Sequence, residues 1–76
     1  MLTALQCRLG RAALGWTIRR LAKETKLSPN TISLFEGGRS EPNPATLNII
    51  RLTFEQAGVE FLNGDQPGVR LVRKGK

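Results

Sequence analysis

The sequence has few of the residues that carry catalysis and metal binding. Its 76 residues include one cysteine, Cys7, and no histidine. A single thiol cannot form an internal disulfide, and without histidine the chain has no plausible zinc site. Since no Ser-His-Asp set or glycine-rich phosphate loop can be assembled, we predict a protein that is not an enzyme and uses no cofactor or metal. Cys7 has no histidine to activate it, and we predict a buried structural thiol in a reducing, cytoplasmic compartment.

Long apolar runs are absent, and acidic residues are few. No stretch of about 18 apolar residues occurs, which excludes a transmembrane helix, and residues 1–10 do not have the pattern of a signal peptide. Twelve Lys and Arg against six Asp and Glu give a net charge of +6. This balance favours a polyanionic partner, nucleic acid before an anionic membrane. The membrane is the weaker choice because no basic amphipathic helix carries bulky aromatics.

Helix caps and apolar spacing predict four short helices. Thr3 and Gln6 form a capping-box pattern. Thr17, Ser28 and Asn43 are further N-cap candidates, and a proline follows each of the last two. The helices are expected over residues 4–14, 18–25, 29–36 and 44–57.

The end of the chain changes from helical to strand-like composition. Residues 59–62 and 69–72 resemble strands, and the residues between them are rich in turn formers, which predicts a β-hairpin. Residues 74–76 are expected to be a frayed basic end. We therefore predict one mainly helical domain over residues 1–58, extended by a hairpin over residues 59–73.

Residues 17–36 read as two helices joined by a tight turn, a helix-turn-helix. The second helix of such a unit has the right size for the major groove of DNA. Ile32 and Phe35 are expected to face the core, so the opposite side of this helix faces outward. The outward residues are Pro29, Asn30, Ser33 and Leu34. The first helix and the turn carry four positive charges against one acidic residue, which suggests a positive field for phosphates.

This pattern resembles the Cro/C1-type (XRE-like) helix-turn-helix domain family of phage repressors and bacterial regulators. The resemblance covers residues 6–58. The matching features are Arg11, Leu14-Gly15-Trp16, Leu21-Ala22, Leu27-Ser28, Thr31-Ile32-Ser33, Glu36-Gly37-Gly38-Arg39, Pro42 or Pro44, Leu47 and Ile50. It implies a four-helix, lambda-repressor-like fold and a small bacterial or phage-type transcriptional regulator, a repressor for example, that binds double-stranded DNA.

The resemblance also implies roles by position. Arg11 and Glu36 match a structural ion pair that links the first helix to the recognition helix. The positions expected to approach base edges are Pro29, Asn30, Ser33 and Leu34. The positions expected to approach phosphates are Thr17, Thr31, Arg39 and Asn43, to which the basic second helix and turn add Arg19 and Lys26.

Three departures from the family pattern bear on function. The outward face of the recognition helix is poor in long polar side chains, so direct base readout is expected to be sparse. Lys26 stands in the turn where the family often has glycine, and a left-handed backbone there costs about 1 kcal/mol or more. Ile18 stands where the family often has glutamine. If Ile18 and Leu34 were both exposed, they would form an apolar spot suited to a protein partner. This motivates an alternative function: an antitoxin or anti-regulator that acts through protein contact and keeps the helix-turn-helix as scaffold.

A homodimer is the expected assembly, reading two half-sites about 34 Å apart. The first helix carries a second apolar stripe, which must meet the C-terminal segment or another chain. The stripe consists of Leu2, Leu5, Leu9 and Ala12. Residues 69–72 would leave an exposed strand edge, and pairing across a two-fold axis would cover it. The dimer contact is therefore predicted at the stripe, the hairpin's outer strand, or both.

Overall fold

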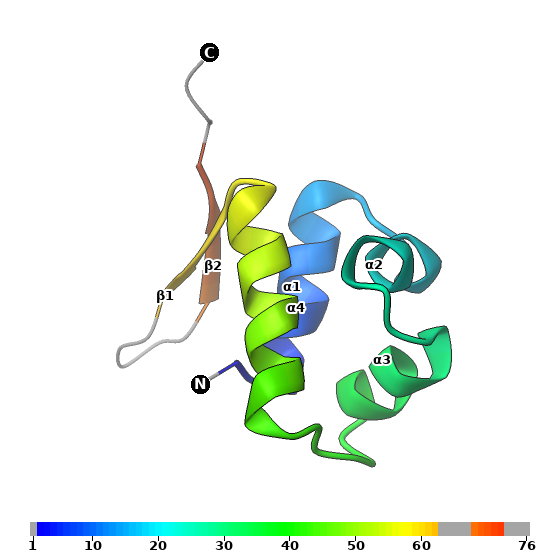
Figure 1. The fold of residues 1–76 in the computed structure, drawn as a ribbon. Coiled ribbons are helices and arrows are strands. Elements are labelled where there is room, and N and C mark those ends of the chain that lie inside the picture. The colour runs from blue at the N-terminus through cyan, green and yellow to red at the C-terminus, as the bar shows by residue number, and fades with distance from the viewer. Residues whose placement is uncertain (1, 63–67, 73–76) are drawn as a thin grey trace.

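The structure is a computed structural model that describes residues 2–62 and 68–72. There it contains four helices followed by a two-stranded antiparallel sheet (Figure 1). The elements are α1 (Ala4–Leu14), α2 (Ile18–Thr25), α3 (Pro29–Glu36), α4 (Pro44–Gln56), β1 (Val59–Leu62) and β2 (Gly68–Leu71). The predicted mainly helical fold with a C-terminal hairpin is confirmed. Helix α4 ends one residue earlier than predicted, and β2 lies one residue earlier. Residues 63–67 of the predicted loop and the predicted frayed end lie outside the described residues.

Side-chain caps begin the helices at the positions that the sequence indicates. The Thr3 hydroxyl accepts from the backbone N–H of Gln6 at 3.1 Å, and the Gln6 amide oxygen accepts from the Thr3 N–H at 3.1 Å. Thr17, Ser28 and Asn43 each accept a hydrogen bond from the backbone N–H three residues ahead. These bonds satisfy donors that a helix start otherwise leaves unpaired.

A single apolar core lies between the helices and the sheet. Its buried residues are Leu2, Cys7, Leu21, Ala22, Ile32, Phe35, Leu47, Ile50, Phe54 and Val59. The Phe54 ring stacks on Trp16 with centroids 6.1 Å apart and meets Phe61 edge to face at 5.7 Å. A Cβ atom added at Gly10 would lie 3.0 Å from the Phe54 ring. Glycine at this position therefore lets α1 pack directly on α4.

The hairpin packs against α1 and α4, on the side of the molecule away from α2 and α3 (Figure 1). Its strands pair as Val59↔Leu71, Glu60↔Arg70, Phe61↔Val69 and Leu62↔Gly68. Strand β2 lies against α1, so the C-terminal segment packs on the helix that carries the second apolar stripe. Of that stripe, Leu2 is buried and Leu9 half-buried, whereas Leu5 and Ala12 are exposed.

Candidate nucleic-acid interface

Helices α2 and α3 pack on each other through a small apolar contact. Leu21 and Ala22 of α2 and Ile32 of α3 are buried there. The small Ala22 side chain allows a close approach of two helices that cross steeply. The Thr25 hydroxyl donates to the Leu21 carbonyl at 2.8 Å, which lets a polar side chain lie buried at the end of α2. The pair forms a helix-turn-helix held on the body by α1 and α4 (Figure 1).

The turn between these helices depends on a left-handed lysine. Lys26 has φ 64°, and its N–H donates to the Ala22 carbonyl. The next residue, Leu27, donates to the same carbonyl at 3.1 Å and packs its side chain against the core. A lysine in this conformation costs about 1–2 kcal/mol relative to a right-handed one. The Lys26 side chain is exposed, and Lys26 precedes the first residue of α3, Pro29, by three positions in the sequence.

A buried ion pair connects the end of α3 to α1. Arg11 donates from Nε to Glu36 Oε2 at 2.7 Å and from Nη2 to Glu36 Oε1 at 2.6 Å. A third donation, from Nη1 to the Trp16 carbonyl at 3.0 Å, holds the guanidinium against the loop after α1. The Glu36 side chain is only 5% exposed and that of Arg11 21%. The hydrogen bond to Glu36 raises the pKa of Arg11, so the guanidinium stays charged.

Cys7 adds a third donor to this cluster. Its thiol is fully buried and donates to Glu36 Oε2 at 3.1 Å. Burial and the bond to Glu36 raise the pKa of the Cys7 thiol well above its ordinary value. The thiol is therefore a neutral structural donor, in line with the inert role expected from the sequence.

One face of the first turn and a half of α3 is exposed and mainly polar. Pro29, Asn30 and Ser33 are exposed, and within the described residues no hydrogen bond engages the side chains of Asn30 and Ser33. Thr31 is half-buried, and its hydroxyl shares a 2.8 Å hydrogen bond with that of Ser28. Leu34 is half-buried rather than fully outward. Asn30 and Ser33 are thus the two side chains on this surface that are free to form new hydrogen bonds.

The positive charges of the described residues divide into paired and unpaired groups. Ion pairs hold Arg11, Arg20, Arg51 and Arg70. Exposed and without an ion pair among residues 2–62 and 68–72 are Arg8, Arg19, Lys23, Lys26 and Arg39. All of these except Arg8 belong to α2, the turn, or the loop after α3. The uncompensated charge is therefore concentrated on the helix-turn-helix.

Arg20 belongs to α2 but is held in place. Its guanidinium lies 4.7 Å from the centre of the Trp16 ring and donates to Glu24 at 2.8 Å. A cation over an aromatic face and an ion pair four residues along the helix both restrict the side chain. Among the basic residues of α2, Arg19 and Lys23 are therefore better available to a partner.

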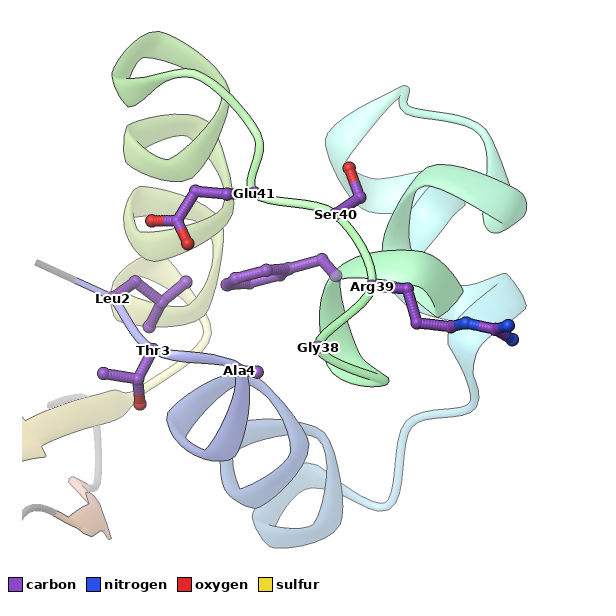
Figure 2. Close-up of a pocket in the computed structure, with 8 residues that line it drawn as sticks. Leu2, Thr3, Ala4, Gly38, Arg39, Ser40 and Glu41 are labelled. Atoms are coloured by element: carbon purple, nitrogen blue, oxygen red, sulfur yellow. The ribbon is translucent and has the colours of Figure 1, made fainter.

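A pocket of about 370 Å³ lies between the start of α1 and the loop after α3. It is lined by Leu2, Thr3, Ala4, Phe35, Gly38, Arg39, Ser40 and Glu41. Figure 2 shows the Arg39 side chain extending away from Leu2 and Thr3, whereas the Glu41 carboxylate points toward Leu2. The two charged groups do not pair, although only Ser40 separates them in the chain. Arg39 is therefore directed to solvent, and no ion pair engages it among the described residues.

A tightly joined helix pair, with a capped and exposed second helix beside unpaired cations, defines the class of helix-turn-helix domains. A family model described as "Helix-turn-helix domain" matches residues 8–67, which is most of the chain. The protein belongs to this family, a helix-turn-helix domain of the Cro/C1 type. A comparison with curated proteins finds no match. In residues 2–62 and 68–72, no helix is both long and apolar enough to cross a membrane.

Proposed function

We propose that this protein is a transcriptional regulator that binds double-stranded DNA with sequence preference, with α3 in the major groove. The observation that carries the proposal is the arrangement of charge. The unpaired cations of α2, the turn and the loop after α3 lie on the same unit as the exposed start of α3. Such a basic rim around a recognition helix fits a polyanionic groove.

Base contacts would come from few residues. The Asn30 amide can pair bidentately with adenine, and the Ser33 hydroxyl can bond to several base edges. Pro29 is exposed and can contact a thymine methyl group. Leu34 can do so only with the exposed part of its half-buried side chain. Because so few side chains can contact base edges, we expect modest discrimination between DNA sequences. Contacts with phosphates should supply a large share of the affinity.

Phosphate contacts would come from both charged and capping residues. Arg19, Lys26 and Arg39 supply positive charge without a competing carboxylate. Asn43 uses its amide oxygen to cap α4 at 2.8 Å, so its amide NH2 group is left to donate to a phosphate. Thr17, the cap of α2, can donate its hydroxyl proton alongside backbone N–H groups. Thr31, in the first turn of α3, can do the same when Ser28 is the donor in the hydrogen bond that their hydroxyls share.

The Arg11–Glu36 pair would serve this function indirectly. Glu36 is the last residue of α3, and the bidentate contact fixes that end of the helix on α1. The pair lies in the interior rather than on the surface that would face DNA. Its role would be to set the angle at which α3 leaves the body of the domain.

We also propose that the protein acts as a homodimer on two half-sites.

The alternative function, an antitoxin or anti-regulator working through protein contact, was motivated by exposure of Ile18 together with Leu34. Both are half-buried, and Ile18 packs against the core, so the expected apolar spot is not formed. That alternative stays a prediction without a structural observation in its favour.

The charge arrangement can be tested with two matched substitutions. Arg39→Gln removes an unpaired cation beside α3, whereas Arg51→Gln removes an ion-paired cation of α4. Fluorescence anisotropy with a labelled random duplex at low salt would measure both. We expect Arg39→Gln to weaken binding by about tenfold, close to the lower value for one hydrogen bond to a charged group, and Arg51→Gln to change it less than twofold. Equal effects would contradict the assigned surface.

A further inference from the structure

Glu41 is the one acidic side chain in residues 2–62 and 68–72 that lacks an ion pair. Arginines hold the other carboxylates of this part of the chain, which belong to Glu24, Glu36, Glu55 and Glu60. Glu41 is exposed, and its side chain has no hydrogen bond or ion pair among the described residues. Its negative charge is therefore available to a cation from outside the chain.

This carboxylate belongs to the pocket of about 370 Å³ between the start of α1 and the loop after α3, hereafter the Glu41 pocket. It points toward Leu2, whereas the Arg39 side chain extends away from that residue (Figure 2). Leu2, Ala4 and Phe35 give the pocket an apolar lining. The volume lies at the lower end of the range for small-molecule sites. The pocket thus joins an apolar lining to a negative charge that no described side chain neutralises.

We propose that the Glu41 pocket binds a small organic amine, with its ammonium group on the Glu41 carboxylate and its apolar body against Leu2, Ala4 and Phe35. Charge-assisted hydrogen bonds of this kind are roughly twice as strong as neutral ones. The start of α1, which borders the pocket, carries roughly half a positive charge, so the full negative charge of Glu41 decides the balance in favour of a cation. A divalent metal ion fits less well, because Glu41 is the one carboxylate in the pocket lining and such ions need several oxygen ligands.

An amine in this pocket would also act on DNA affinity, a consequence that rests on the proposed function. Arg39, a proposed phosphate contact, and Glu41 lie on the same loop with only Ser40 between them. The unpaired carboxylate repels phosphates brought to Arg39, and a bound ammonium cancels this repulsion. We expect a roughly twofold gain in affinity for a random duplex, the scale of a single charge that water and salt screen. The pocket would then be an effector site that strengthens binding.

Amide chemical shifts of the ¹⁵N-labelled full chain, followed during titration with 2-phenylethylamine at pH 7, test the site. The matched probe is 3-phenylpropionate, which carries the same ring on a chain of similar length but has a charge of the opposite sign. We expect saturable shifts around the Glu41 pocket with the amine, and a dissociation constant on the order of 1–10 mM, in keeping with so small a ligand. The carboxylate probe should give no saturable shift there.

Three variants assign the binding to this pocket. Glu41→Gln removes the charge and should keep the fold, because Glu41 makes no bond among the described residues. We expect it to raise the dissociation constant of the amine by about five- to tenfold, between the upper value for an exposed ion pair and the lower value for a hydrogen bond to a charged group. Ala4→Leu narrows the pocket from the α1 side with a good helix former and should weaken binding as well. Glu60→Gln is the control, because that carboxylate lies on the hairpin and is held by Arg70.

A chain that shows no saturable shift with the amine would overturn the proposal. Equal binding of 3-phenylpropionate, an unchanged affinity in Glu41→Gln, or shifts centred on the hairpin would overturn it as well. Duplex affinity is measured separately by fluorescence anisotropy, with and without the amine at constant ionic strength. A rise in the wild type that is absent in Glu41→Gln supports the effector role, and no rise contradicts that role. Amine binding by a chain that binds no DNA contradicts the proposed function and leaves the site standing.

Discussion

Replacement of Arg11 by methionine should remove a large part of the domain's stability. The substitution keeps an apolar stem of similar length but leaves the Glu36 carboxylate, whose side chain is 5% exposed, without the guanidinium that accounts for two of its hydrogen bonds. Removing one partner of a buried pair costs about 3–5 kcal/mol. A 76-residue domain has a total stability of roughly 4–11 kcal/mol at about 0.05–0.15 kcal/mol per residue. The loss is therefore a large fraction of the whole stability, between about a quarter and all of it.

Urea unfolding followed by the fluorescence of Trp16, the single tryptophan, would measure the loss. Trp16 stacks on Phe54 and is close to the cluster through its carbonyl, so its emission should report the transition. The double variant Arg11→Met/Glu36→Leu removes both charges and should recover most of the stability, because a buried pair and an apolar replacement are often close in free energy. A loss below about 1 kcal/mol in Arg11→Met alone would refute the reasoning that this pair is structural.

Further substitutions test packing, the turn and the thiol. Gly10→Ala should destabilise by about 1 kcal/mol in thermal unfolding, because overpacking against Phe54 outweighs the gain in helix propensity; a higher Tm would contradict the close approach. Lys26→Gly should stabilise by up to about 1 kcal/mol by relieving the left-handed backbone while weakening DNA binding, and a loss of stability would count against strain in the turn. The raised pKa of Cys7 keeps the folded thiol protonated, whereas the unfolded thiol ionises above about pH 8.5. Stability should then fall above that pH by up to about 1.4 kcal/mol per unit relative to Cys7→Ser, which keeps a hydroxyl donor toward Glu36; parallel profiles would exclude the thiol as the cause.

Local signals predicted most of the fold. Caps such as Ser28 followed by Pro29 fix helix starts because they act within one turn of the chain. The strand boundaries were less certain since β2 is positioned by its register with β1, and the prediction was one residue late. Similarly, α4 ends at Gln56 rather than Ala57, where helix assignment depends on a single terminal bond.

The sequence predicted which residues belong to the candidate site better than it predicted how their side chains are arranged. The engagement of Arg20 by Trp16 depends on the path of the chain between two helices, although its spacing to Glu24 was visible in the sequence. The hydrogen bond from Cys7 to Glu36 joins residues that are distant in the chain, and no local pattern indicates it. Half-burial of Ile18, likewise, is set by packing against the core rather than by its position in α2.

The central claim is that this helix-turn-helix binds the DNA backbone through the unpaired cations around α3. The most direct measurement is the affinity for a random duplex at several salt concentrations. With three or four phosphates neutralised per domain, log K should fall linearly with log salt, with a slope of about −3 to −4 per domain, and Arg39→Gln should reduce that slope by about one. Binding that does not depend on salt, or no binding at low salt, would contradict the account.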